Sequence, residues 1–391
     1  MSTRPPRLAL YCHNLWGLGH IARSVRIADA AVELLNADCA IVTGCRCLNA
    51  SGLKIQDSIH IESLPPAQFD NVGRFFEYGN PDNTQILQQR AEQILTFLRE
   101  WGADVVIVDN LPLGLGGEMI EALNAATLES WPTRFVWGMP YPECEGKTNR
   151  PPRNPKIIRS FERYDLAIAY TEESWLPVFP EYQAYGLPER QDYVGMVAPR
   201  LATTPPSEVP LIAVMAGGGR ESHVVLEWTV AGLRPQLEDG SLQLRILVGP
   251  LGDWERAEHL VEGLRGVELL SEASMDEVIN GAHVVVSRMG YNSTFSLLQT
   301  EIPLVFVPLP TRDDEQTNRG ERVKCLDRIW VIDQRADEAD RSLIGALKSA
   351  LSAPRSPRSL PFSLSGAQQT ARWVQRLTQE ARDLELEDLR L

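Results

Sequence analysis

Short, continuously apolar segments alternate with longer amphipathic segments along the first half of the chain. The apolar segments show no regular inside–outside alternation, which is typical of parallel strands covered by helices on both faces. Between them, residues 22–35 and 84–101 place apolar side chains at helical spacing. Strand and helix repeated in this order predict a doubly wound parallel sheet. The expected strands are residues 8–11, 39–42, 105–108, 135–137 and 166–169.

The same pattern starts again after residues 195–210, where prolines among small side chains indicate a linker. Helical patterns over residues 223–233 and 254–264 separate the apolar segments that follow. The pattern therefore predicts a second α/β domain with a sheet of its own. Its expected strands are residues 211–215, 244–248, 267–270, 284–287, 304–307 and 329–332.

A chain of 391 residues exceeds what one hydrophobic core usually organises. We therefore expect two Rossmann-like domains, residues 1–197 and 209–365, joined by a linker over residues 198–208. A polar, proline-rich stretch precedes a final amphipathic helix within residues 366–391. Doubly wound sheets bind ligands beyond the carboxyl ends of their strands, so we expect the site in a cleft between the two domains.

Composition narrows the class of protein. Hydrophobic residues make up 43% of the chain and charged residues 23%, which are the proportions of a globular protein. The net charge of -14 argues against nucleic acid as a partner, because a broad phosphate-binding face needs clustered Lys and Arg. The six cysteines are scattered and fit neither a zinc site nor a redox pair, so we expect reduced thiols. With no signal-like or membrane-spanning apolar segment, we expect a cytoplasmic protein without stable membrane insertion, and the oligomeric state stays open.

A glycine-containing loop follows the first expected strand of each domain. In the first domain, Gly17 and Gly19 precede His20, where the first helix opens. Glycines let the backbone approach a ligand closely, and a helix N-terminus offers unpaired N–H groups. An ordinary turn in which His20 caps the helix is an equal interpretation. The loop of the second domain is suited either to phosphate oxygens or to a tight turn, and it consists of Gly217, Gly218, Gly219 and Arg220.

The most informative loop follows the apolar run that ends at residue 286. Residues 287–294 bring glycine, amide and hydroxyl groups to the expected start of a helix at Ser293. This arrangement favours an anion, because the N-terminal end of a helix is electropositive. Capping of the helix by Asn292 or Ser293 is a second interpretation, and it is compatible with the first. The candidate residues of this loop are Arg288, Met289, Gly290, Tyr291, Asn292 and Ser293.

A charged segment, residues 308–319, follows the next strand at the same edge of the expected sheet. It contains Glu315, Gln316 and Arg319. A carboxylate can accept hydrogen bonds from both hydroxyls of a ribose, and a neighbouring amide can bind sugar hydroxyls. Charged runs are usually solvated surface, but this one directly follows a buried strand, which favours a binding function.

These motifs resemble those of the GT-B glycosyltransferase family that contains the bacterial enzyme adding N-acetylglucosamine to lipid I. They are more similar still to a branch of predicted bacterial glycosyltransferases, which pairs a Gly-x-Gly-His motif and a triple glycine with a Gly-Tyr-Asn-Thr turn. The resemblance spans both domains. In two departures, Ser293 replaces the usual threonine, and Arg288 and Met289 precede the glycine where Met-Gly is expected. The branch also has an Arg-x-x-Glu-Gln-x-x-Arg motif, which appears here as Arg312, Glu315, Gln316 and Arg319.

The resemblance implies a GT-B fold and a role for each motif. The diphosphate of a nucleotide sugar would lie against the triple glycine and the loop from Gly290 to Ser293. The resemblance also implies that no metal and no cofactor are bound, since helix dipole, backbone N–H groups and arginine neutralise the leaving diphosphate. That arginine would be Arg220, Arg288 or Arg319. The remaining donor contacts would be Glu315 to the ribose, Gln316 to the sugar and backbone near Glu272 to the base.

Inverting transfer needs a base that accepts the proton of the acceptor hydroxyl. His20 is the first candidate, and its role as a phosphate ligand or an acceptor-orienting residue is a second interpretation. Asp109 is the next candidate, because it follows the buried run of residues 105–108 at the expected ligand edge. His13 is a third, although its position at the end of a strand is equally consistent with packing.

The sequence therefore predicts a metal-independent, inverting hexosyltransferase that moves a sugar from a nucleotide-diphosphate sugar, expected to be UDP-linked, to an acceptor hydroxyl. Residues 69–78 and 140–155 are candidate acceptor loops without the basic and apolar patch of a bilayer-docking surface. A small soluble metabolite, expected in secondary metabolism, is favoured over a lipid-linked acceptor. Two alternatives stay open: a nucleotide-sugar hydrolase or hydrolysing epimerase, and a non-catalytic sugar-nucleotide-binding partner.

Overall fold

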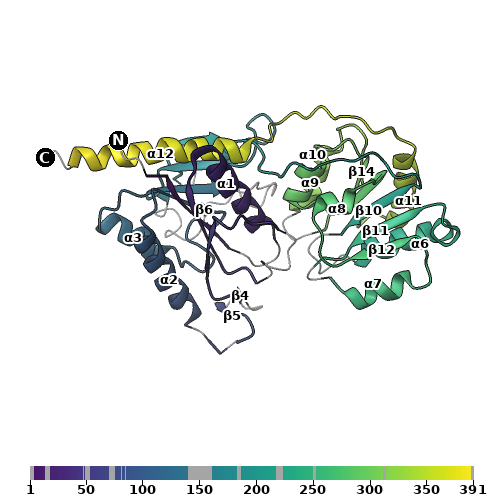
Figure 1. Cartoon of the computed structure of the whole chain (residues 1–391), viewed down its shortest axis with the longest axis horizontal. Coiled ribbons are helices and arrows are strands. Elements are labelled where there is room, and N and C mark those ends of the chain that lie inside the picture. The colour runs from purple at the N-terminus through teal and green to yellow at the C-terminus, as the bar shows by residue number, and fades with distance from the viewer. Residues whose placement is uncertain are drawn as a thin grey trace.

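The computed structural model describes residues 4–13, 18–46, 48, 53–69, 75–80, 82–83, 85–139, 161–182, 186–216, 223–249, 252–310 and 314–388. Within them, two parallel sheets flanked by helices form two domains that lie side by side (Figure 1). The predicted pair of Rossmann-like domains is thereby confirmed.

The larger sheet of the N-terminal domain is parallel throughout, with the strand order β3-β2-β1-β6-β7-β8-β9. Its five central strands bury nearly every side chain, as their continuous apolar sequences predict. The sequence pattern does not predict β3 and β9, because these short edge strands are polar and partly exposed. The bounds are β1 Arg7–Cys12, β2 Asp38–Thr43, β3 His60–Ser63, β6 Val105–Asp109, β7 Arg134–Met139, β8 Leu166–Ala169 and β9 Gln191–Tyr193.

Helices flank this sheet, and a small antiparallel hairpin follows β3. Helix α2 ends where its sequence predicts, since Gly102 adopts a left-handed φ of 60° and returns its N–H to the carbonyl of Leu98. The hairpin strands are β4 Ala67–Phe69 and β5 Phe75–Glu77. The helices are α1 Gly19–Leu35, α2 Ile86–Trp101, α3 Ile120–Leu128 and α5 Phe179–Tyr182.

The sheet of the second domain is also parallel, with the strand order β12-β11-β10-β13-β14-β15. All six of its strands fall on the segments that the apolar pattern predicts. The strands are β10 Leu211–Met215, β11 Gln243–Leu247, β12 Val267–Leu270, β13 Val284–Ser287, β14 Leu304–Phe306 and β15 Ile329–Val331. The helices are α6 His223–Asp239, α7 Trp254–Val261, α8 Met275–Ile279, α9 Tyr291–Leu297, α10 Glu315–Val323 and α11 Ala339–Leu351.

Helix α6 corrects one sequence prediction. The sequence places its end at residue 233, before a proline that cannot donate an intrahelical hydrogen bond, yet the helix continues through Pro235 to Asp239. Leu233 and Leu237 lie on the buried side of the helix, on opposite sides of Pro235 in the sequence. Burial of these side chains in the core of the second domain offsets the lost hydrogen bond.

The two domains share hydrophobic contacts as well as a linker. One cluster of buried side chains fills the N-terminal sheet and continues to Met289, Tyr291 and Phe295 around helix α9 of the second domain. A separate cluster packs α6 and α11 against the other face of the second sheet. Helix α9 is therefore anchored from both domains.

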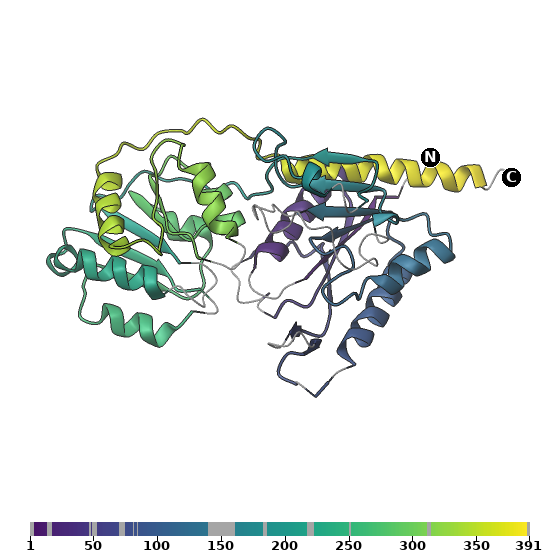
Figure 2. The same ribbon diagram turned by 180° about the vertical axis from the view of Figure 1, so that it is seen from behind.

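The C-terminal helix α12, Gly366–Asp388, returns to the N-terminal domain and packs against α1. Figures 1 and 2 show it in yellow along that domain, far from the second sheet. The carboxylate of Glu380 pairs with Arg190 at 2.7 Å, and the indole of Trp373 donates to Asp192 at 2.5 Å. None of the helices in the described part of the chain is long and apolar enough to cross a membrane.

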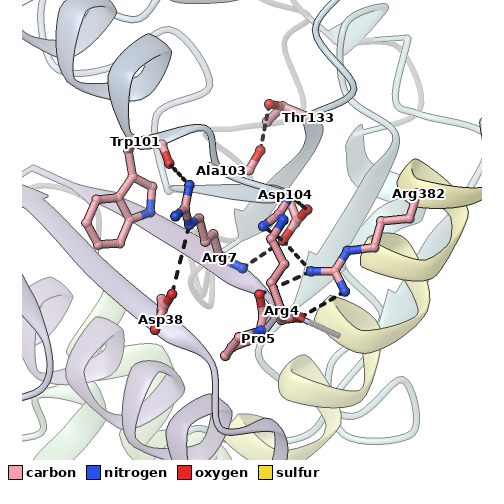
Figure 3. A network of polar contacts seen from close by, with 9 residues as sticks. All are labelled: Arg4, Pro5, Arg7, Asp38, Trp101, Ala103, Asp104, Thr133 and Arg382. Carbon is pink, nitrogen blue, oxygen red and sulfur yellow. Dashed lines mark hydrogen bonds and ion pairs between the residues drawn. The ribbon is translucent and has the colours of Figure 1, made fainter. Parts of the chain in front are cut away.

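Asp104, immediately before β6, joins this helix to the start of the chain (Figure 3). Its carboxylate accepts from the guanidinium of Arg4 at 2.7 and 2.9 Å and from the backbone N–H of Arg7 at 2.8 Å. Arg382 of α12 reaches the same carboxylate at 3.1 Å and also donates to the carbonyls of Arg4 and Pro5. The Asp104 side chain is only 4% exposed, so solvent screens these contacts little.

We expect Asp104→Ala to lower the free energy of unfolding by about 3 kcal/mol, because it leaves Arg382, whose side chain is only 13% exposed, without its carboxylate. Arg4→Ala is the matched control, and it should cost less than about 1 kcal/mol because Arg4 is 39% exposed. Urea unfolding of both variants measures the difference. Equal losses would show that Asp104 does not hold α12.

Candidate active site

The carboxyl ends of two neighbouring strands bring the first group of polar side chains together. His13 directly follows β1, and Asp109 is the last residue of the adjacent strand β6. Helix α1 starts beside them at Gly19, and residues three apart on a helix share a face. His20 and Arg23 have that spacing, and both reach Asp109.

His20 and Asp109 form a hydrogen-bonded pair, with Nδ1 2.5 Å from Oδ2. Because an ionised carboxylate only accepts, Nδ1 donates the proton of this bond, and in the neutral form of the ring the lone pair is on Nε2. The His20 ring is 27% exposed, whereas Asp109 is 4% exposed. The interpretation of His20 as a helix cap is wrong, since Leu18 occupies the N-cap position and the imidazole points to the carboxylate.

Arg23 is the third member of this group. Its Nε lies 3.0 Å from Oδ1 of Asp109, and its Nη2 lies 2.8 Å from both oxygens. Burial alone would raise the pKa of Asp109, but the charge of Arg23 and the His20 contact together hold that pKa well below its usual range. The carboxylate is therefore ionised wherever the protein is folded near neutral pH.

His13 lies against His20, with their ring centroids 4.2 Å apart. It is 6% exposed, and its Nε2 lies 3.5 Å from the amide nitrogen of Asn110. Burial, together with the neighbouring His20 and Arg23, lowers the pKa of His13 to about 3. A neutral, buried imidazole of this kind packs beside His20 and is a poor proton acceptor.

The second domain brings helix α9 to the same place. The helix begins at Tyr291, two residues before the sequence-predicted start, so its N-cap is Gly290 and not Asn292 or Ser293. Among the described residues, no heavy atom beyond those of Gly290 and its two chain neighbours lies within 4 Å of the position that a Cβ at Gly290 would take. The amide of Asn292 donates to the carbonyl of Gly19 at 3.0 Å. The first turns of α9 and α1 are therefore in direct contact.

Helix α10 shapes the loop that leads into α9. Gln316 accepts hydrogen bonds through Oε1 from the backbone N–H of Met289 and of Leu309, each at 3.0 Å. The guanidinium of Arg319, which is fully buried, donates to the carbonyl of Met289 and pairs with Glu315 at 2.5 Å. Both backbone groups of Met289 are thus held from one helix, which fixes the approach to Gly290.

The other predicted donor residues differ in exposure and in their place in the second domain. Glu315 is 40% exposed and opens α10, whereas Arg288 is buried and donates to the carbonyl of Val307 and to Gln334. Glu272 is exposed and follows β12 at the carboxyl edge of the sheet. The predicted positions outside the described residues are Gly17, Gly217, Gly218, Gly219, Arg220, Arg312 and the loop at residues 140–155.

The loop motifs of the sequence include neither Arg23 nor Tyr170, although both lie at the site. The Arg23 guanidinium lies over the Tyr170 ring at 5.0 Å and over the Tyr291 ring at 5.6 Å. The spacing of His20 and Arg23 on one helix is a signal for the first of these. No pattern in the sequence points to Tyr170, because its ring is brought next to Arg23 only by the tertiary structure. The described residues contain no group of three or more His, Cys, Asp or Glu side chains arranged to hold a metal ion.

Residues 212–369 match the glycosyltransferase family 28 C-terminal domain. No curated protein sequence matches the chain. Among solved structures, the glycosyltransferase SnogD from Streptomyces nogalater is 15% identical, with a TM-score of 0.57 over 97% of this chain and 100% of that chain. MurG of Acinetobacter baumannii is 13% identical, with a TM-score of 0.52 over 97% and 100%. The UDP-GlcNAc 2-epimerase of Methanocaldococcus jannaschii is 12% identical, with a TM-score of 0.53 over 95% and 99%.

These matches confirm the predicted GT-B fold and the resemblance drawn from the loop motifs. The chain is a two-domain protein of that fold, and residues 212–369 in its second half match the C-terminal domain of glycosyltransferase family 28. Transferases and an epimerase share the architecture, so the chemistry follows from the residues of the site and not from the fold.

The low pKa of His13 predicts that the free energy of unfolding depends on pH. Between its ordinary pKa near 6.5 and its folded value of about 3, the unfolded chain binds a proton that the folded chain does not. The contribution of neutral His13 to the free energy of unfolding is therefore fully present above the ordinary pKa, and it is lost as the pH falls toward the folded value. From about pH 7 to about pH 5, we expect the wild type to lose about 2 kcal/mol more than His13→Gln in urea unfolding. The same substitution at exposed His60 is the control, and an identical pH dependence for wild type and His13→Gln would contradict the assignment.

Proposed function

We propose that this protein is an inverting glycosyltransferase that moves a sugar from a nucleotide-diphosphate sugar, UDP-linked by preference, to a hydroxyl of an acceptor. One observation carries the proposal: the hydrogen bond from Asn292 to the carbonyl of Gly19 joins the anion-favouring start of α9 to the turn that bears His20. A donor phosphate at Gly290 would therefore lie next to an imidazole whose Nε2 is available as a base.

On the donor side, the diphosphate would lie against the backbone from Gly290 to Ser293, where N–H groups and the helix dipole favour negative charge. Glu315 would accept from the ribose hydroxyls, and its pairing with Arg319 orients the carboxylate. The Oε1 of Gln316 shapes the Met289 loop, which leaves its amide nitrogen for the donor sugar. Fixed dipoles and arginine charge stabilise the leaving diphosphate, so the proposed reaction uses no metal.

On the acceptor side, His20 would accept the hydroxyl proton at Nε2 while the acceptor oxygen attacks the anomeric carbon. The new bond from oxygen to the anomeric carbon forms as the bond to the diphosphate breaks, and the diphosphate leaves with that electron pair. Asp109, ionised and bonded to Nδ1, stabilises the imidazolium that results. Attack from the face opposite the leaving group inverts the anomeric centre.

The acceptor is proposed to be a small soluble metabolite, such as a product of secondary metabolism. The hairpin after β3 supports an apolar or aromatic acceptor, because the rings of Phe69 and Phe75 lie 5.0 Å apart and Phe69 is 38% exposed. Nearby Tyr78 is 42% exposed and lies beneath the guanidinium of Arg46. Aromatic side chains on a connecting segment are a common means of binding flat organic molecules.

A hydrolase or hydrolysing epimerase is the second candidate function. The observation that favours it is the similarity to the UDP-GlcNAc 2-epimerase, which covers 95% of this chain. In that case His20 would take its proton from water or from the donor sugar, and no acceptor would be needed. A non-catalytic binding partner has less support, because the His20 and Asp109 pair occupies the expected site.

Donor turnover distinguishes these functions. Nucleotide sugars are first screened by thermal shift, and the stabilising donor is then incubated with hydroxyl-bearing acceptors and followed by mass spectrometry. We expect turnover to rise steeply with acceptor and to survive excess EDTA. Turnover that is indifferent to every acceptor would favour the hydrolase or epimerase. Loss in EDTA with recovery in magnesium or manganese would contradict the metal-free mechanism.

His20→Ala should lower kcat by roughly 10²–10⁴ and leave donor affinity nearly intact, as expected when only acid–base assistance is lost. His20→Asn keeps a hydrogen-bonding group without basicity, so it should lose as much. Arg23 still balances Asp109 in both variants, which protects the fold. Steady-state kinetics and calorimetric donor titration measure the two effects. Near-normal turnover of His20→Asn would move the role of base to Asp109.

A further inference from the structure

Arg23 and His20 share one buried carboxylate. Oδ2 of Asp109 receives both His20 Nδ1, at 2.5 Å, and Arg23 Nη2, at 2.8 Å. Oδ1 is occupied by Arg23 alone, through Nε and Nη2. The negative charge that faces His20 is therefore already balanced by a guanidinium, unlike in a simple pair of histidine and aspartate.

The two cationic groups of this site also face each other. Nη2 of Arg23 lies 2.9 Å from Nδ1 of His20. Both atoms donate to Asp109, so neither accepts from the other. A second proton on His20, at Nε2, would place an imidazolium against the guanidinium with one carboxylate between them. The total charge of His20, Arg23 and Asp109 would then rise from zero to +1, which is unfavourable in a buried site.

Three other buried titratable groups at the site are neutral near neutral pH. Burial raises the pKa of the Cys12 thiol to about 12 and that of Tyr170 well above its usual range, while His13 has a pKa of about 3. Tyr291 donates its hydroxyl proton to the carbonyl of Tyr170 at 2.8 Å. Among the described residues, the charged side chains that His20 contacts are Asp109 and Arg23.

The position of Arg23 is set from both domains. Its side chain is 3% exposed and lies against the rings of Tyr170 and Tyr291. Tyr291, the first residue of α9, is itself held by a hydrogen bond from the backbone N–H of Val197 to its hydroxyl, at 3.0 Å. A movement of Arg23 away from Asp109 would therefore disturb its contact with Tyr291 at the start of helix α9.

We propose that Arg23 is a positioning residue that holds Asp109 in place and, by sharing its charge, sets the pH range over which His20 accepts a proton. A positive charge at this distance disfavours a second positive charge on the ring, so Arg23 opposes the stabilisation of the imidazolium by Asp109. The effect on the rate rests on the proposed function, whereas the effect on the His20 titration does not.

The first test compares full-length Arg23→Gln with Arg23→Lys, which keeps the charge. The midpoint of the His20 ring titration is followed by NMR, with His20→Asn used to assign the resonance. We expect Arg23→Gln to raise the midpoint by about one pH unit or more, and Arg23→Lys to leave it near the wild-type value. In the transferase assay the acid limb of the kcat profile should move by the same amount. An unchanged midpoint in a folded Arg23→Gln protein would overturn the proposal.

A second pair of variants covers the case in which Arg23→Gln alone does not fold. Asp109→Asn leaves Arg23 uncompensated beside His20, whereas the double variant with Arg23→Gln has no charge on either partner. The His20 midpoint should be higher in the double variant, by about one pH unit or more. Equal midpoints would overturn the proposal. A raised midpoint in protein that turns over no nucleotide sugar would leave this inference standing and refute the proposed function.

Discussion

A carboxylate taken out of water needs a compensating charge and hydrogen bonds, and Asp109 has the guanidinium of Arg23 and the Nδ1–H of His20. The rest of the candidate site depends on that requirement. The pair of β1 and β6 brings His13 and Asp109 to one edge, and the first turn of α1 supplies the two nitrogen-bearing partners. Because His20 is tied through Nδ1, its other nitrogen is directed away from the carboxylate, in a ring that is still partly exposed. The orientation of the proposed base thus follows from the electrostatics of a buried strand end.

The same group of residues connects the two domains. The rings of Tyr170 and Tyr291 cover the Arg23 guanidinium, and Tyr291 begins the helix whose first turn also meets Gly19. On the other side of that helix, Gln316 and Arg319 hold both backbone groups of Met289. Residues first proposed as donor contacts therefore also have a structural role, which is to fix the loop at Gly290. The proposed donor contacts and the proposed base share a single packed region, so a substitution at one is expected to affect the other.

The framework that supports this region is closed by the C-terminal helix. Helix α12 leaves the second domain and packs against α1, the helix that bears His20 and Arg23. Asp104, at the opposite end of β6 from Asp109, pairs with Arg382 of α12 and Arg4. One strand thus carries a buried carboxylate at each end, one that attaches the terminal helix and one that organises the site. This arrangement explains why residues more than 250 positions apart in the chain stabilise the same helix–sheet layer.

The sequence by itself determined the two parallel sheets, because continuously apolar strands and amphipathic helices in strict alternation have few other ways to bury their surfaces. It also predicted that His20, Asp109 and the loop at Gly290 lie at the ligand-binding edges of the sheets, since polar residues after buried strands collect at one edge of a parallel sheet. It did not reveal the edge strand β3, the continuation of α6 past Pro235 or the earlier start of α9. Local propensity is weak at those points, and tertiary packing decides them. The roles of Arg23 and Tyr170 were likewise decided only by the fold, because a shared charge depends on distances between elements that no local pattern records.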